Sequence, residues 1–117
     1  MIIGIHHIAM IVRSEDTVDF YSKLGFKECL RKERRYDTVV LLCGYGIELE
    51  LFIDASHPKR ALNPEALGLR HIALQVNRIE DVVEKFNLPI GAIGIDWNGI
   101  RYANTQDPDG NIIELHE

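Results

Sequence analysis

One stretch of this chain is written twice, and that repeat limits the fold more than any other feature. The segment GIHHIAMIV begins at Gly4, and the similar segment GLRHIALQV begins at Gly68, 64 residues later. The same offset of 64 residues places Glu50 on Glu114, near the other end of each copy. One offset that matches both ends indicates two repeated structural units, because self-similarity at a fixed spacing marks such repeats.

Each copy of the repeat predicts the same order of elements: a strand, a helix and three further strands. Runs of β-branched and apolar residues between turn residues predict the strands, and apolar residues at helical spacing predict the helices. In the first copy Ser14 is a suitable N-cap and Gly25 a suitable C-terminal cap. We expect strands at 5–12, 26–30, 36–42 and 46–53 with a helix at 14–25, and strands at 69–76, 89–95, 100–105 and 111–116 with a helix at 79–86.

The expected organisation is one α+β domain made of two modules in tandem. A length of 117 residues suits a single domain. The first module spans 1–53 and the second 69–117, and each reads βαβββ. Residues 54–68, which contain two prolines and show no clear period, are expected to form the linker.

Composition and charge exclude several classes of partner. The net charge of −5 provides no overall basic surface for phosphates, so we expect no nucleic-acid partner. No apolar run approaches the roughly 20 residues of a membrane helix, so we expect no membrane contact, and the N-terminal residues do not resemble a signal peptide. The chain has only two cysteines, Cys29 and Cys43, which are too few for a disulfide framework. We therefore expect a cytoplasmic protein, because the cytosol keeps thiols reduced. Cys43 is expected to be an inert buried thiol.

Strand parity directs four polar side chains away from the helices. Side chains alternate between the two faces of a strand, so Leu49 and Leu51 share a face expected to pack on the helix, and Glu50 points the other way. The repeat gives Glu114 the equivalent position, and the first strand of each module carries a histidine on the same side. The side chains expected to face one concavity are therefore those of His7, Glu50, His71 and Glu114.

Two imidazoles and two carboxylates at one point suit a divalent metal ion, and mixed nitrogen and oxygen ligation favours six-coordination with two positions left for water or substrate. Glu48 has the same parity as Glu50 and stays open as an alternative ligand. The offset of 64 favours Glu50, since Glu48 would align with Ile112. Histidines and glutamates on strands are often only structural, but the paired recurrence of His and Glu favours a metal site.

Three other features have two interpretations each. The basic run at 31–35 could recognise a substrate carboxylate, but a solvated hairpin is the favoured interpretation. Trp97 could form a lid, or it could be a rim aromatic that packs on the sheet. His116 shares the parity of Glu114 and could support a metal ligand, but its position near the C-terminus favours a surface residue.

The segments HHIAMIV, GIELELF, GLRHIALQV and DPDGNIIELHE together resemble the vicinal oxygen chelate (VOC) superfamily, which includes glyoxalase I, dioxygenases and bleomycin resistance proteins. The resemblance covers essentially the whole chain. It implies two tandem βαβββ modules that form a cupped mixed sheet with the helices on its outer face. It also implies a homodimer and a divalent ion, namely nickel, cobalt or zinc, with manganese or iron as alternatives. The implied metal ligands are His7, Glu50, His71 and Glu114.

The full set of two histidines and two glutamates resembles glyoxalase I best, which implies a metal-dependent lyase of the lactoylglutathione lyase type. The implied substrate is the hemithioacetal of a 2-oxoaldehyde and a thiol, isomerised through an enediolate. The resemblance implies Glu114 as the base and Glu50 as its partner. Asn104 and Gln106 stand where glyoxalases often carry aromatic residues, which implies a smaller or more polar substrate than a glutathione adduct.

Several alternatives stay open at this point. The same scaffold serves extradiol dioxygenases and thiol transferases, which use two histidines and one glutamate, and epimerases, which place a glutamine at the position of Glu50. It also serves non-enzymatic antibiotic-binding proteins, which generally lack the ligands. The sequence leaves open which glutamate is the base, which metal and thiol are used, and whether one chain or two build each site.

Overall fold

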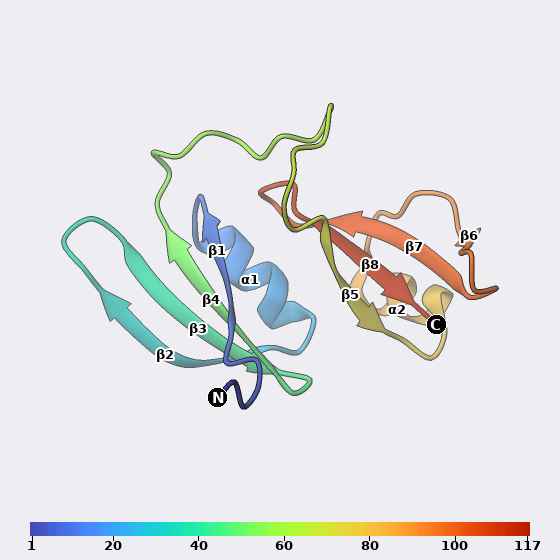
Figure 1. Ribbon diagram of the computed structural model, residues 1–117, viewed down its shortest axis with the longest axis horizontal. Helices are drawn as coiled ribbons and strands as arrows, with labels where there is room; N and C mark the ends of the chain where they lie inside the picture. Colours follow the sequence, from blue (N-terminus) through green and yellow to red (C-terminus); the bar gives the residue numbers. More distant parts are fainter. The chain divides into compact units, whose positions relative to one another are not determined.

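The computed structural model describes all residues from 1 to 117, and they form two compact units, Met1–Lys59 and Arg60–Glu117. In Figure 1 each unit is a four-stranded sheet with one helix on one of its faces. Both units follow the order strand, helix, strand, strand, strand. The expected βαβββ modules are therefore confirmed.

The first unit contains a mixed sheet in the order β1-β4-β3-β2. Strand β1 runs parallel to β4, and the other neighbours are antiparallel, because short turns connect β2, β3 and β4. Its elements are β1 (Ile8–Val12), α1 (Glu15–Lys23), β2 (Lys27–Glu33), β3 (Thr38–Gly44) and β4 (Ile47–Ile53).

The second unit repeats this topology with the strand order β5-β8-β7-β6. Strand β5 is parallel to β8, and the remaining pairs are antiparallel. Its elements are β5 (His71–Gln75), α2 (Ile79–Phe86), β6 (Gly94–Ile95), β7 (Arg101–Gln106) and β8 (Ile112–His116). No helix of the chain has both the length and the apolar character that crossing a membrane requires.

Helix α1 begins and ends where the sequence predicts. The Ser14 hydroxyl accepts a hydrogen bond from the backbone N–H of Asp16 (3.2 Å), which satisfies one of the free donors at the helix N-terminus. Gly25 follows the last turn with a φ of 111°, a conformation that favours glycine. The hydroxyl of Tyr45 donates to the carbonyl of Leu24. A side chain at Gly25 would meet the hydroxyl of that ring.

The alternation of side chains along β4 separates a core face from a polar face. Leu49 and Leu51 are completely buried, whereas Glu48, Glu50 and Phe52, on the opposite face, are half-buried. Strand β8 shows the same alternation. The buried apolar residues of the two units are Val12, Val18, Tyr21, Leu24, Phe26, Val40, Leu42, Leu49, Leu51, Ile79, Leu88, Ala103, Ile113 and Leu115.

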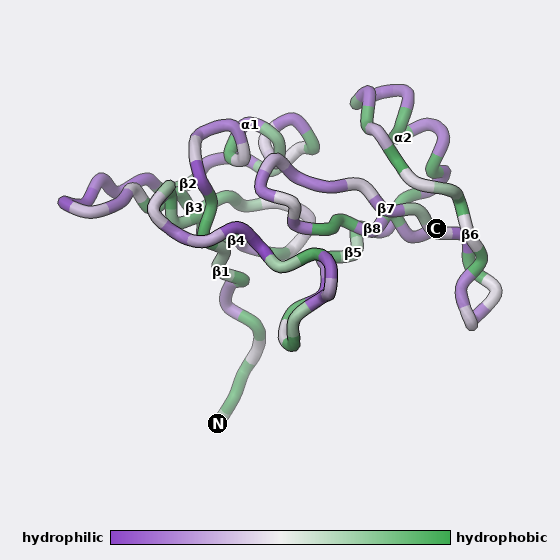
Figure 2. Tube along the Cα trace, turned by 90° about the horizontal axis from the view of Figure 1, so that it is seen from above, coloured by the Kyte–Doolittle hydropathy of each residue, from purple (hydrophilic) through white to green (hydrophobic).

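The first strand of each module is shorter than expected. Strand β1 begins at Ile8 and β5 at His71. The register before β5 leads into the turn that precedes β8, whereas the register before β1 leads to Glu48, which still lies within β4. The N-terminal segment, coloured mainly as hydrophobic in Figure 2, is exposed. The expected strand at 89–95 is reduced to two residues, whereas helix α2 has the predicted bounds.

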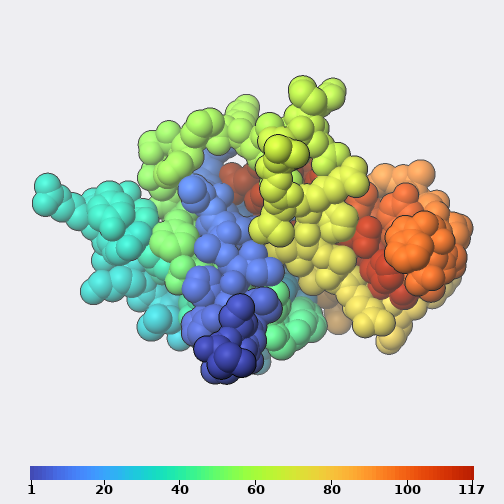
Figure 3. Space-filling view, in the orientation of Figure 1, coloured from blue at the N-terminus to red at the C-terminus, as the bar shows by residue number.

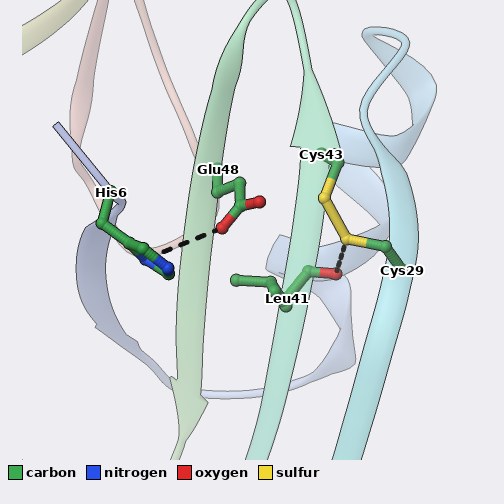
Figure 4. The surroundings of a disulfide bond; sticks show 5 residues. All are labelled: His6, Cys29, Leu41, Cys43 and Glu48. Atoms are coloured by element: carbon green, nitrogen blue, oxygen red, sulfur yellow. Dashed lines mark hydrogen bonds and ion pairs between the residues drawn. A yellow bond between two sulfur atoms is a disulfide. The ribbon is translucent and has the colours of Figure 1, made fainter. Parts of the chain in front are cut away.

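The expectation of a free thiol at Cys43 is wrong, because Cys29 and Cys43 form a disulfide between β2 and β3 (Figure 4). The register of these strands shifts between Glu28 and Leu30, so Cys29 occupies a bulge beside Cys43. A bulge changes which residues face each other, and strand parity does not reveal it. The cysteine count therefore no longer supports a reducing compartment.

Candidate metal centre

In the first module, His7 and Glu50 lie side by side on the face of the sheet opposite the helix. Nε2 of His7 lies 3.5 Å from Oε1 of Glu50, and both side chains are about one-third exposed. Glu50 is paired with Ala9 in the parallel register of β1 and β4, and His7 immediately precedes β1. His7 and Ala9 are two residues apart, so their side chains point to the same face of the sheet. Because Ala9 is paired with Glu50, the imidazole lies on the face of Glu50.

Glu48, the alternative ligand, has a different neighbour. Its Oε2 lies 3.9 Å from Nδ1 of His6, as Figure 4 shows, and His6 is 84% exposed. The two adjacent imidazoles contact each other, with 2.8 Å between their Nδ1 atoms. Glu48 therefore faces the more solvated histidine, and Glu50 faces the more buried one.

The second module repeats the arrangement. Nε2 of His71 lies 3.8 Å from Oε1 of Glu114. Glu114 is paired with Ala73, two residues after His71, as Glu50 is paired with Ala9. The structure thus brings together the predicted residues in two equivalent pairs.

One neighbour of Glu114 is closer than the sequence indicated. Nδ1 of His116 lies 3.1 Å from Oε2 of Glu114, and an ionised carboxylate can only accept, so the imidazole donates. His116 is half-buried, which corrects the favoured interpretation of a free surface residue. Its shared parity with Glu114 was the signal that pointed to this contact. Asn104 is paired with Glu114 across β7 and β8 and adds a polar neighbour on that face.

The donor atoms of each pair fit a metal ion. Imidazole nitrogen and carboxylate oxygen bind zinc-like ions at about 2.0–2.2 Å, so two donors of one ion lie at most about 4.4 Å apart. The separations of 3.5 Å and 3.8 Å satisfy that limit. Within either module, no three histidine, cysteine or acidic side chains form a group that could hold an ion. Each module therefore offers a pair of ligands.

The first module also contains an open cavity of about 570 Å³ on and beside the face that carries Glu50. Phe52 and Ile11, which are paired across β1 and β4, form part of its wall. Sequence reasoning did not find this cavity, although the parity of Phe52 with Glu50 was a signal. The lining residues are Ala9, Met10, Ile11, Tyr36, Asp37, Phe52, Asp54 and His57.

The basic run at 31–35 is divided between two faces. Arg31 binds Glu15 of α1 and also Glu28, which raises the pKa of the guanidinium and lowers the pKa of Glu15. Arg34 donates through Nε and Nη2 to both oxygens of Asp37 (2.6 Å and 2.7 Å). This pairing lowers the pKa of the Asp37 carboxyl. The sequence treated these arginines as one group, but their environments differ.

Trp97 does not pack on the sheet in this structure. Its side chain is almost completely exposed, in the turn between β6 and β7. This excludes the interpretation as a rim aromatic that covers the sheet.

Comparison with known proteins gives the same fold. The chain is 35% identical to the uncharacterised protein YwkD of Bacillus subtilis, over 97% of this chain and 96% of that protein. A glyoxalase family protein from Enterococcus faecalis is also 35% identical, with a TM-score of 0.90 over 97% of both chains.

Two more distant crystal structures share the fold alone. A lactoylglutathione lyase from Agrobacterium tumefaciens has a TM-score of 0.68 at 22% identity, over 97% of this chain and 92% of that one. The other is a variant of the fosfomycin resistance protein FosX from Listeria monocytogenes, complexed with Mn(II) and dihydroxypropylphosphonic acid. It has a TM-score of 0.76 at 20% identity, over 99% of this chain and 93% of that one.

The family assignment rests on the sequence profile as well as on the fold. The profile of the Glyoxalase/Bleomycin resistance protein/Dioxygenase superfamily matches residues 4–115, nearly the whole chain. The matched range contains all four candidate ligands. The chain therefore belongs to the Glyoxalase/Bleomycin resistance protein/Dioxygenase superfamily.

Proposed function

We propose that this protein is a metal-dependent lyase of the glyoxalase I type. Its substrate is the hemithioacetal formed from a 2-oxoaldehyde and a thiol. The observation that carries the proposal is the pair of His and Glu side chains at equivalent positions of both modules, 3.5 Å and 3.8 Å apart. The shared fold with a lactoylglutathione lyase supports it.

The proposed metal ligands are His7, Glu50, His71 and Glu114. Each module supplies one nitrogen and one oxygen donor, so a site with four protein ligands needs one pair from each module, of one chain or of two. Nickel, cobalt or zinc suits this donor set, with manganese or iron as alternatives. Manganese in the FosX complex is consistent with a divalent ion in this fold.

The two glutamates supply the proton transfer in this proposal. A divalent ion held by these ligands would supply Lewis acidity for the negative charge that develops when the substrate loses its proton. Glu114 would remove the proton next to the carbonyl and return it at the neighbouring carbon, with Glu50 as its partner on the other side of the substrate. His116 would orient Glu114 through its hydrogen bond.

We also propose that the protein is a cytoplasmic homodimer. Glutathione is the main thiol buffer of the cytosol, so its adducts with oxoaldehydes arise there. Met1, Ile2, Ile3 and Ile5 are exposed almost completely, and a second chain would bury this apolar segment.

A second candidate function is that of a metalloenzyme of another class, a thiol transferase or a dioxygenase, that binds its metal ion through the same ligands. Asn104 favours it, because this polar side chain beside Glu114 makes the second module suited to a small polar substrate. An antibiotic-binding protein without a metal is the non-enzymatic alternative.

The test combines metal content with turnover. Purified protein loaded with nickel, cobalt or zinc is assayed with methylglyoxal plus glutathione, and the iron-loaded form with catechols. The proposal expects one bound ion for each set of four ligands and thioester formation that stops on chelation. Metal binding without turnover of any thiol adduct would contradict the lyase and leave the metal centre intact. The absence of a bound ion would favour the non-enzymatic alternative.

A further inference from the structure

The cavity in the first module continues the face that carries Glu50. Phe52 follows Glu50 by two residues on β4 and therefore points to the same side. Ile11 is paired with Phe52, and Tyr36, which is 70% exposed, adds an aromatic wall. A substrate whose reacting end lies at Glu50 would place its remaining atoms against these apolar side chains.

Arg34 lies at the edge of this cavity. Its guanidinium carbon is 4.7 Å from the centre of the Tyr36 ring and 5.4 Å from that of Phe52. Tyr36, Phe52 and Asp37, which all contact Arg34, line the cavity. In Figure 3 the tip of the hairpin between β2 and β3, in cyan, projects from the first unit.

The surroundings fix the orientation and the charge of Arg34. The hydrogen bond to Asp37 raises the pKa of the Arg34 guanidinium most, and attraction to Tyr36 and Glu50 adds to this. The bonds to Asp37 use Nε and Nη2. Nη1 therefore keeps two N–H groups that have no partner within the protein.

The other charged groups around the cavity are already paired. Asp37 is occupied by Arg34, and Oδ1 of Asp54 accepts from the backbone and hydroxyl of Ser56 (2.9 Å and 2.7 Å). The second oxygen of Asp54 lies 3.4 Å from Nδ1 of His57. Nη1 of Arg34 is thus the free charged donor at the cavity edge.

We propose that Arg34 is a specificity-determining residue that binds a carboxylate of the substrate through Nη1. The substrate class is a thiol adduct whose thiol part combines an apolar segment with a carboxylate. The inference rests on the proposed function, because it takes the reacting end of the substrate to lie at Glu50. Asp37 acts as a positioning residue that holds the guanidinium plane against the two rings.

The test measures binding first, so that it does not depend on turnover. The probes are 3-(benzylthio)propanoate and its neutral primary amide, titrated into the metal-loaded protein by calorimetry. We expect the carboxylate to bind at least about tenfold more tightly than the amide, as a charge-assisted hydrogen bond provides. We expect Arg34→Gln to remove the difference in affinity between the two probes. Arg35→Gln changes the net charge equally at the next residue, and we expect it to keep that difference.

Folding and function have separate controls. The double variant Arg34→Gln/Asp37→Asn removes both charges, and unchanged circular dichroism and metal content show that the module is intact. Equal binding of the two probes to the native protein, no binding of either, or a preference that survives Arg34→Gln would overturn the proposal. A preference that depends on Arg34, without turnover of any hemithioacetal, would contradict the lyase and leave this subsite established.

Discussion

Nδ1 of His116 donates a hydrogen bond to Oε2 of Glu114 (3.1 Å), and the first module has no equivalent contact. The offset of 64 residues aligns His116 with Phe52, whose ring cannot form a hydrogen bond to Glu50. The two glutamates of the repeat therefore have different support. Glu114 is held by a neighbour, whereas Glu50 faces only His7 at ion-pair distance.

The first prediction concerns this asymmetry. His116→Phe places in the second module the residue that the first module already has, and it removes the hydrogen bond to Glu114. We expect the affinity for zinc or nickel to fall by about 10- to 100-fold, the usual cost of losing a residue that orients a metal ligand. Isothermal titration measures it. His57→Phe is the control, because His57 contacts Asp54 and none of the candidate ligands, and an equal loss in both variants would contradict the role of His116.

The second prediction separates the two candidate ligands on β4. Glu50→Gln removes the carboxylate that faces His7, and Glu48→Gln makes the same change on the same face, beside the exposed His6. We expect Glu50→Gln to lose metal at least about tenfold more readily than the native protein, because a neutral amide is a poorer ligand than a carboxylate. Metal content after dialysis measures the loss, and Glu48→Gln retains the ion. A reversed order would make Glu48 the ligand.

Much of this site follows from periodicity. The alternation of Leu49, Glu50 and Leu51 gives one buried and one polar face, and the repeat transfers this assignment to β8. Helix α2 matches its predicted bounds because its charged start and apolar spacing agree with its packing. Local patterns determine these features, so the sequence alone reveals them.

The features that the sequence missed depend on contacts between distant residues. Cys29 lies at a bulge, and a bulge arises from the pairing of two strands rather than from the pattern of either one. Arg31 lies on β2 and Arg34 in the turn that follows it, so the two side chains reach different partners. The start of β5 depends on the turn before its partner strand. Such contacts are settled only when the strands pair.

The third prediction concerns the disulfide. Cys29 and Cys43 are 14 residues apart, and closing a loop of that length stabilises a protein by about 3 kcal/mol in the chain-entropy account. The double variant Cys29→Ser/Cys43→Ser should lose about that much free energy of unfolding in urea titrations. A reductant should weaken the native protein similarly and leave the double variant unchanged. Equal sensitivity of both proteins to the reductant would contradict the assignment.

The fourth prediction concerns the turn before β8. Oδ1 of the buried Asp107 accepts from the backbone N–H groups of Asp109 and Asn111, and Oδ2 accepts from the Asn111 side chain. Asp107→Ala leaves these donors unpaired, which costs about 1–3 kcal/mol for a buried group. Asp107→Asn keeps an acceptor at Oδ1 and should lose less. Urea unfolding compares them, and equal stability of the two variants would exclude this role for the carboxylate.

The last prediction is the pH dependence of the Arg34–Asp37 pair. Hydrogen bonding by Arg34 lowers the pKa of Asp37 below its ordinary value of 3.8 in the folded protein. The pair therefore stabilises the fold at neutral pH, and this contribution is lost as the pH falls below 3.8 and through the folded pKa. Carboxyl carbon shifts in an NMR titration follow Asp37 directly. We expect its midpoint to rise in Arg34→Gln and to stay unchanged in Arg35→Gln. An identical midpoint in the native protein and Arg34→Gln would show that the two side chains are not paired in solution, and the positioning of Arg34 beside the cavity would lose its support.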